Sequence, residues 1–569
     1  MSDTQHVTRN TQHVTRNTHH ASHKVMVIGL DGATWDILQP WMEAGYLPNL
    51  AGLVVAGTSG RLRSTIPPVT APAWATFQTG MNPGKHGLFH FTRYQPGSYD
   101  TALVNATSIG PRTLWGLLGD AGKRLAIINV PVTYPPQPVN GVLVAGLLSP
   151  SPRQAFWPPE LYDEIVAAVG EYQVFTPVRT FDYLGVKGFV EQVTALARGR
   201  AAVARYIFNK EDWDFFMVHF QSTDIIQHAL WAWADCRHPD FDRKPEVEKA
   251  QVRGFYQELD GLVGELCALV GDERPVIIMS DHGFGPVMRR LYLNQWLLNE
   301  GLLSAPGQSS LKGWVLGWVE EAVRRADIFK LRRRLIKPRS RGEGLVERVK
   351  RDALIEWPQT KAFALSGPFF GRIYLNTKGR EPQGMVHPGP AWDALRERIA
   401  EGLLALRDPA NGQPMIERVW RREEVYHGNR ADELPDLVVK PADGYQVVTE
   451  FRRGLLVEPM PDFLSGTHRM EGILAMRGPG IRQGVAFDGG SIADLAPTIL
   501  YLMGLAVPAA MDGRVLEEAL EERLLSRQPV RFAHGADEET TETRHAGEVY
   551  SAADSAEVEA RLAGLGYLS

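Results

Sequence analysis

Three short apolar runs, each followed closely by an aspartate, constrain the fold of this chain more than any other feature. The runs are VMVIGL (25–30), DFFMVHF (214–220) and PVIIMS (275–280), and they lead to Asp31, Asp224 and Asp281. Short apolar runs without polar alternation are typical of strands buried on both faces, as in a parallel sheet. We therefore expect three strands in the interior of one sheet.

Helical patterns separate these runs, at 44–56, 191–208 and 247–270. This alternation predicts an α/β fold with a mostly parallel central sheet and helices on both faces. Ligands of such sheets bind beyond the carboxyl ends of the strands. One aspartate there could simply cap a helix or form a turn. Three aspartates accompanied by histidines favour a functional site.

Histidines lie close to two of the three aspartates. Asp224 and His228 are four residues apart, so one helical turn would place both side chains on the same face. Asp281 and His282 are adjacent and would point to opposite faces of a regular strand. Both reach one ion only if the chain bends, which Gly283 permits.

A further histidine, His468, lies in the glycine-flanked segment SGTHRMEG (465–472), which we expect to be a loop. On its own, a histidine in a loop is more often a structural residue than a ligand. Together with the Asp/His pairs it completes a mixed nitrogen and oxygen donor set. Such a set suits Zn²⁺ first, with Mn²⁺ or Fe as alternatives.

The segment STIPPVTAPAWATFQTG (64–80) contains Thr70 between two prolines and a short helical pattern. Threonine is a good N-cap, and proline is tolerated in the first helical turn. We therefore expect Thr70 to cap a helix, and ask whether it also reacts. Trp74 in the same segment is a weak candidate for a substrate-binding wall, with core packing as the alternative.

Five motifs appear in order between residues 29 and 481. They are GLDG, a T-x-P segment ending in TG and followed by NPGKHG, D-x-x-x-H, SDHGF and a late G-T-H. In this order they resemble the type I phosphodiesterase/nucleotide pyrophosphatase family of the alkaline phosphatase superfamily. Phrases such as NVPVTYPP (129–136) and YLNTKGREPQG (374–384) are similar to its bacterial phosphohydrolase/phosphomutase branch.

The resemblance implies an alkaline-phosphatase-like core with two divalent metal ions. By position, one ion would be held by Asp31, Thr70, Asp281 and His282, and the other by Asp224, His228 and His468. Thr70 would then be the catalytic nucleophile and carry a phosphothreonine intermediate, because metal coordination lowers the pKa of a hydroxyl.

The expected function is metal-dependent phosphoester hydrolysis, most readily of a phosphodiester. Two alternatives are a phosphomutase of the same fold and an inactive metal-binding scaffold. Many family members resemble T-F-P-N, where the Asn holds a phosphate oxygen, but this chain has Ala73 there. Backbone amides or another side chain must then hold that oxygen. Lys85, in NPGKHG, is a weak candidate for neutralising substrate charge, with surface solvation as the alternative.

Charge and composition limit the partners. The chain has 61 basic and 66 acidic residues, a net charge of −5, which argues against a nucleic-acid polymer and leaves a small phosphoester as the expected substrate. No apolar run is long enough to cross a membrane, and residues 1–23 lack the apolar core of a signal peptide. With only two cysteines, these features favour a cytoplasmic location.

The predicted domain organisation is a core interrupted by one insertion. The core comprises residues 24–304 and 359–525, with a basic helical cap insertion at 305–358, all following a disordered tail at 1–23. Residues 330–341 carry seven Lys or Arg and form either a solvated cap or a contact with an anionic membrane surface. An acidic linker (526–553) precedes a C-terminal helix (554–569), which we expect to dock on the core or on a second subunit; the oligomeric state stays open.

Overall fold

The computed structural model describes residues 24–175, 181–305, 355–365, 367, 369–452, 454–461, 464–534 and 549–568. Three predicted segments fall wholly or largely outside these ranges. They are the N-terminal tail 1–23, the insertion at 305–358 with its basic stretch 330–341, and residues 535–548 of the acidic linker.

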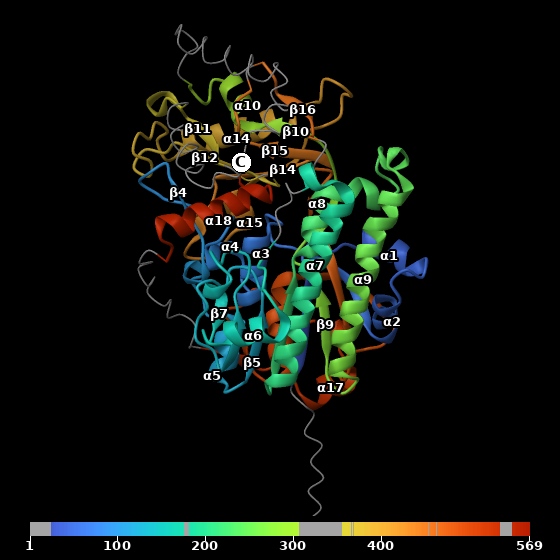
Figure 1. Ribbon diagram of the computed structural model, residues 1–569. Helices are drawn as coiled ribbons and strands as arrows, with labels where there is room; N and C mark the ends of the chain where they lie inside the picture. The colour runs from blue at the N-terminus through green and yellow to red at the C-terminus, as the bar shows by residue number, and fades with distance from the viewer. Residues whose placement is uncertain are drawn as a thin grey trace, which may run out of the picture.

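A nine-stranded sheet forms the centre of the molecule (Figure 1). Its strands, in spatial order, are β19 (Val485–Ser491), β2 (Thr58–Arg63), β18 (Glu471–Arg477), β9 (Val276–Met279), β1 (Val25–Leu30), β8 (Phe215–Phe220), β5 (Leu125–Ile128), β6 (Gly141–Val144) and β7 (Phe156–Trp157). The pairs β1–β8, β1–β9, β5–β8, β5–β6 and β2–β19 are parallel. The predicted α/β class with a mostly parallel sheet is confirmed.

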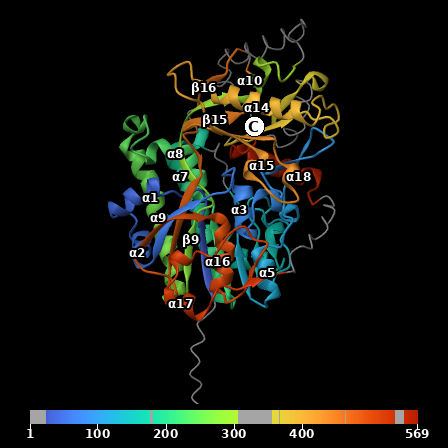
Figure 2. The same cartoon turned by 180° about the vertical axis from the view of Figure 1, so that it is seen from behind.

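The three runs singled out in the sequence are adjacent strands, in the order β9, β1, β8. Every residue of these strands is buried, as expected for strands with helices on both faces. The helices α7 (Phe181–Lys210), α8 (Ser222–Ala234) and α9 (Glu246–Val270) lie on the face seen in Figure 1. The helices α3 (Thr70–Thr79), α5 (Leu114–Asp120) and α16 (Leu495–Leu502) lie on the opposite side, as Figure 2 shows.

The helical predictions differ in how well they fit. Segment 191–208 lies within α7, and 247–270 coincides with α9 except for one residue at its start. Segment 44–56 is wrong as a single helix. Helix α1 (Trp35–Glu43) ends before it, and α2 (Pro48–Ala56) begins inside it. Gly45, with φ +77°, turns the chain between these helices, because glycine adopts positive φ without strain.

Two smaller sheets lie above the large one in Figure 1. The first is built on β10 (Gly283–Tyr292), which pairs with β15 (Gly444–Val448), β16 (Val457–Pro459) and β17 (Gly466–Arg469). The second has the order β11 (Ala362–Leu365), β12 (Gly371–Leu375), β14 (Leu437–Pro441), β13 (Ile416–Arg421). Together with α10 (Leu293–Asn299) and α14 (Pro390–Leu404) they enclose a second apolar core.

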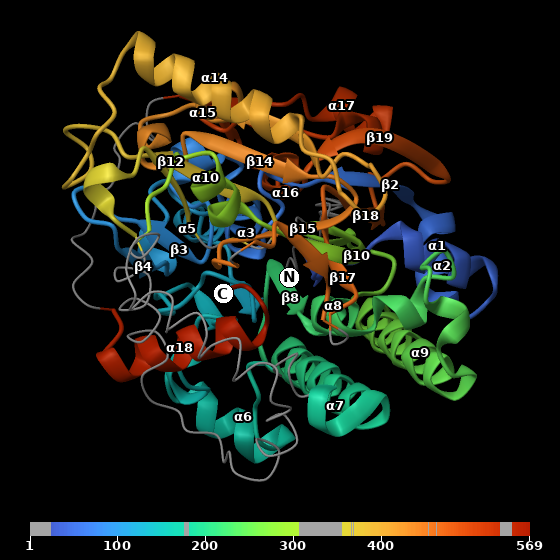
Figure 3. The same ribbon diagram turned by 90° about the horizontal axis from the view of Figure 1, so that it is seen from above.

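The C-terminal helix, α18 (Ala552–Gly564), docks on the core of its own chain. Val558 and Leu562 in this helix, and Leu565 directly after it, are fully buried. Arg561 donates hydrogen bonds to the carbonyls of Leu147, Ser149 and Pro150. In the view from above, α18 leads the chain end towards the middle of the molecule (Figure 3). None of the described helices is long and apolar enough to cross a bilayer.

Candidate active site

The three predicted aspartates meet at one edge of the central sheet. Asp31 directly follows β1, Asp281 lies between β9 and β10, and Asp224 lies in the first turn of α8, just beyond β8. Because β9, β1 and β8 are adjacent and parallel, their carboxyl ends share this edge. All three carboxyl groups are fully buried.

Asp31, Asp281 and His282 form a first triad, whose ligand atoms lie within 4.8 Å of one another. His282 Nε2 is 3.3 Å from Asp281 Oδ2 and 3.5 Å from Asp31 Oδ1. The predicted bend at Asp281-His282 therefore exists. Gly283 serves it through close packing, since a Cβ there would lie 1.9 Å from the carbonyl oxygen of Glu471.

Asp224, His228 and His468 form a second triad. His468 Nε2 lies 3.1 Å from Asp224 Oδ1 and 3.1 Å from His228 Nε2. Asp224 and His228 share a face of α8, as their spacing predicts. The loop predicted around His468 is wrong, because this residue lies in strand β17, opposite Phe284 of β10. The glycines beside His468 suggested a loop because the strand that contains them has only four residues.

The two triads are in contact. The rings of His282 and His468 stack with 3.6 Å between centroids and 22° between planes. Phe369 also stacks on His468, at 3.6 Å. The six predicted Asp and His side chains thus form one buried cluster.

The hydrogen bonds of the three histidines suit metal ligation. Nδ1 of His228, His282 and His468 lies 3.3, 3.1 and 2.8 Å from the backbone carbonyls of Gly466, Gly283 and Pro68 respectively. A carbonyl only accepts, so each Nδ1 carries the proton and each Nε2 lone pair faces the cluster. Two such lone pairs 3.1 Å apart, on His228 and His468, require a positive charge between or beside them.

The buried carboxylates of Asp31 and Asp281 also suit metal ligation. Asp31 Oδ1 and Asp281 Oδ2 are buried and find no hydrogen-bond donor among the described residues. Burial, with the charge of Asp224, raises the pKa of Asp31 well above its usual value, and burial with the charge of Asp31 does the same for Asp281. Burial lowers the pKa of His282 and of His468 to about 4, which keeps both rings neutral near pH 7. Divalent cations would satisfy all these groups at once.

Thr70 is the first residue of α3, and Val69 is the N-cap, so the prediction that Thr70 caps this helix is wrong. The Thr70 hydroxyl instead lies 3.4 Å from His282 Nε2 and 3.2 Å from Tyr567 Oη. Its side chain is fully buried at the cluster. The amides of Thr70 and Ala71 begin the helix and have no intrahelical acceptor, which makes this end suitable for an anion.

The two weak candidates for substrate binding differ in position: Trp74 lies beside Asp31 and His219, whereas Lys85 lies at Asp512. Trp74 is fully buried and packs edge-on against Phe77 and His219, as the core-packing alternative predicts. Lys85 forms an ion pair with Asp512 and donates to the carbonyl of Ala510 at 2.8 Å. Its charge is therefore already compensated.

Two residues of the candidate site, His219 and Tyr567, were not predicted from the sequence. His219 Nε2 lies 2.9 Å from Asp31 Oδ2 and its Nδ1 lies 3.0 Å from the carbonyl of Asn129, so His219 orients Asp31 with Oδ1 towards the cluster. The sequence signal for His219 was a single polar residue within the apolar strand FFMVHF (215–220). Tyr567, close to the chain end, contacts Asp224 as well as Thr70. No local pattern pointed to it.

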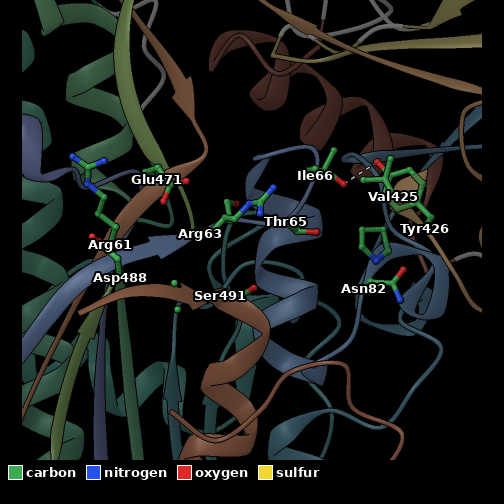
Figure 4. A pocket seen from close by; sticks show the side chains of 14 residues that line it. Arg61, Arg63, Thr65, Ile66, Asn82, Val425, Tyr426, Glu471, Asp488 and Ser491 are labelled. Carbon is green, nitrogen blue, oxygen red and sulfur yellow. Dashed lines mark hydrogen bonds between the residues drawn. The ribbon is translucent and has the colours of Figure 1, made fainter. Parts of the chain in front are cut away.

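A separate cavity of about 570 Å³ is lined by residues of β2, β18 and β19 and of the segments 64–66, 82–83 and 425–426 (Figure 4). Its lining includes Arg61, Arg63, Tyr426, Glu471 and Asp488. The seven predicted site residues, all described by the structure, do not line it. It is therefore distinct from the Asp/His cluster.

The type I phosphodiesterase/nucleotide pyrophosphatase family model matches residues 25–469, and the chain belongs to this family. It is accordingly a phosphoester hydrolase from a metal-dependent family. No curated protein sequence matches the chain.

Two solved structures are similar in fold. Human ectonucleotide pyrophosphatase/phosphodiesterase 5 is 14% identical with a TM-score of 0.48, and the match covers 88% of this chain and 100% of that one. Phosphonoacetate hydrolase from Sinorhizobium meliloti, in complex with phosphonoformate, is 16% identical with a TM-score of 0.49, covering 84% and 94%. Likenesses this distant assign neither a substrate nor a site residue.

Proposed function

We propose that this protein hydrolyses phosphodiesters through a phosphothreonine formed on Thr70, with two divalent cations in the Asp/His cluster. One observation carries the proposal. The hydroxyl of Thr70, buried at the start of a helix, lies within 3.4 Å of the first triad and is linked through Tyr567 to the second. A hydroxyl placed between two metal-binding triads is suited to nucleophilic attack.

In this proposal each triad holds one cation. Asp31, Asp281 and His282 hold the first, which the Thr70 hydroxyl also approaches, and Asp224, His228 and His468 hold the second. Bound cations would lower the pKa of the Thr70 hydroxyl and offset the negative charge that develops on phosphoryl oxygens. Mixed carboxylate and imidazole donors favour Zn²⁺, with Mn²⁺ or Fe as alternatives.

In the proposed reaction, Thr70 is the nucleophile and backbone amides bind the phosphoryl group. Thr70 Oγ forms a bond to phosphorus while the bond from phosphorus to the leaving oxygen breaks, and the proton lost from the Thr70 hydroxyl ends on the leaving alcohol. Water then attacks phosphorus, the bond from phosphorus to Thr70 Oγ breaks, and one proton of the water restores the Thr70 hydroxyl. The free amides of Thr70 and Ala71, at the positive end of α3, are placed to bind a phosphoryl oxygen. This contact suits a chain that has Ala73 where relatives carry an Asn.

Turnover of synthetic esters tests the proposal. The wild-type chain, supplied with Zn²⁺ or Mn²⁺, should hydrolyse bis-p-nitrophenyl phosphate faster than the mono ester. Thr70→Ala should lose this activity by at least about 10³-fold, because the nucleophile is removed. Thr70→Ser, which keeps a hydroxyl, should retain part of it. Full activity of Thr70→Ala would refute the nucleophile, and turnover of neither ester by the wild type would favour the phosphomutase or scaffold alternatives.

A further inference from the structure

The phenol of Tyr567 joins the proposed nucleophile to the second triad. Its Oη donates a hydrogen bond to Asp224 Oδ2 at 2.8 Å and lies 3.2 Å from Thr70 Oγ. The side chain is fully buried, and its ring packs against Phe91 with 4.7 Å between centroids. A residue near the chain end therefore reaches the centre of the site.

The direction of the two hydrogen bonds follows from counting protons. A phenol has one proton, and the Asp224 carboxylate can only accept, so the proton of Tyr567 is used in that bond. The Thr70 hydroxyl is then the donor to Tyr567 Oη. A directed chain runs from Thr70 through Tyr567 to Asp224, and it fixes the rotation of the Thr70 hydroxyl.

The two oxygens of Asp224 have separate partners. Oδ1 lies 3.1 Å from His468 Nε2 and 3.3 Å from His228 Nε2, within the second triad. Oδ2 receives the Tyr567 phenol. Tyr567 therefore orients Asp224 so that one oxygen faces the triad.

The segment that carries Tyr567 is firmly attached to the core. Leu562 and Leu565 are fully buried, and burial of each such side chain is worth about 1.5–3 kcal/mol. Tyr550 donates to the carbonyl of Leu148 at 3.1 Å, and its ring stacks on Tyr134. Arg561 contributes its three bonds to backbone carbonyls. These contacts make residues 549–568 a fixed wall of the site, although they lie outside the family-matched segment 25–469.

We propose that Tyr567 is a positioning residue for phosphoryl transfer, which holds the Thr70 hydroxyl and the Asp224 carboxylate in their reactive orientations. This inference rests on the proposed function, because it assigns Tyr567 a role towards the nucleophile. The active site then includes a residue of the segment 549–568.

Tyr567→Phe tests this directly, because it removes the hydroxyl and keeps the ring. We expect kcat for bis-p-nitrophenyl phosphate to fall about 10- to 100-fold, the effect of losing a hydrogen bond to a charged group, while KM changes less than about twofold. The matched control is Tyr445→Phe, which removes another buried phenol bond to a carboxylate, that of Asp408, in the second apolar core and outside the segment 549–568. It should leave kcat unchanged. Both variants are assayed at saturating Zn²⁺, because Tyr567→Phe removes a partner of Asp224 and should also weaken metal binding. The thermal midpoint should be equal in the two variants.

The outcomes separate this inference from the function on which it rests. If Thr70→Ala abolishes turnover but Tyr567→Phe matches Tyr445→Phe in kcat, the role of Tyr567 is refuted and the proposed function stands. A higher kcat in Tyr567→Phe would show that the Tyr567 hydroxyl obstructs the reaction instead of positioning the nucleophile. This result would also overturn the inference. If Thr70→Ala remains fully active, the proposed function itself fails.

A second full-chain variant keeps the inference falsifiable should Tyr567→Phe fold poorly. Arg561→Gln retains Tyr567 but removes bonds that hold its segment to the carbonyls of Leu147, Ser149 and Pro150. We expect a smaller fall in kcat, about threefold or more, at unchanged KM. An unchanged or raised kcat, with the segment shown to be loosened by faster proteolysis, would contradict the role of Tyr567.

Discussion

The imidazoles of His282 and His468 stack 3.6 Å apart, although they come from separate sequence motifs and from two different candidate metal sites. Strands β10 and β17 bring them together, since Phe284, two residues after His282, pairs with His468. The two candidate metal sites therefore contact each other through these stacked rings. Changes at one site are expected to be felt at the other.

Removing one of the stacked histidines should change the metal content of both candidate sites. In His468→Ala the second triad loses one of its three ligands, so we expect bound metal to fall from about two ions to about one per chain. The remaining ion should bind more weakly than in the wild type, because His282 loses its stacking partner. Elemental analysis after dialysis measures both effects. Two tightly held ions in His468→Ala would exclude this residue as a ligand.

His219 should tune metal affinity without touching substrate. Replacing it by Asn removes the contact that orients Asp31, so metal affinity should fall about 10- to 100-fold, the usual effect of losing a partner of a ligand. Titration of metal-free protein followed by activity measures this change. His387→Asn, at an exposed position, is the control and should behave as the wild type. Equal affinities in the two variants would remove His219 from the site.

Lys85 should matter for stability and not for substrate. Lys85→Gln breaks the ion pair with partly buried Asp512, so the free energy of unfolding should fall by about 1 kcal/mol. KM for the diester should change less than about twofold. Urea unfolding and steady-state kinetics separate these effects. A large rise in KM at unchanged stability would restore Lys85 as a substrate-binding residue.

Gly283 should be intolerant of any side chain. A Cβ at this position would lie 1.9 Å from the carbonyl oxygen of Glu471, so Gly283→Ala should lower the free energy of unfolding by about 1–3 kcal/mol. The matched control is Gly199→Ala, in α7, where a Cβ meets nothing within 4 Å. That change should stabilise the protein by about 0.5–1 kcal/mol. Chemical unfolding of both variants compares them, and equal stability would show that β10 and β18 can separate at Gly283.

The sequence allowed the sheet edge to be predicted because the apolar strand runs are local patterns, whereas the division of the candidate ligands between two ions came from the resemblance to the family. Asp31, Asp224 and Asp281 follow apolar strand runs, and the four-residue spacing to His228 is helical. The strand at His468 was missed because β17 has only four residues and its pairing with β10 is a tertiary contact. The contacts of Thr70 with His282 and Tyr567 join residues far apart in the chain, which no local rule describes.

Direct detection of phosphorylated Thr70 tests the central claim most sharply. The wild-type protein, mixed with bis-p-nitrophenyl phosphate and quenched in acid within one turnover, would be digested and analysed by mass spectrometry. We predict that the peptide containing Thr70 gains the mass of one phosphoryl group, and that the corresponding Thr70→Ala peptide does not. Turnover by the wild type with no phosphorylated Thr70 peptide at any quench time, or with the label on another residue, would contradict the claim.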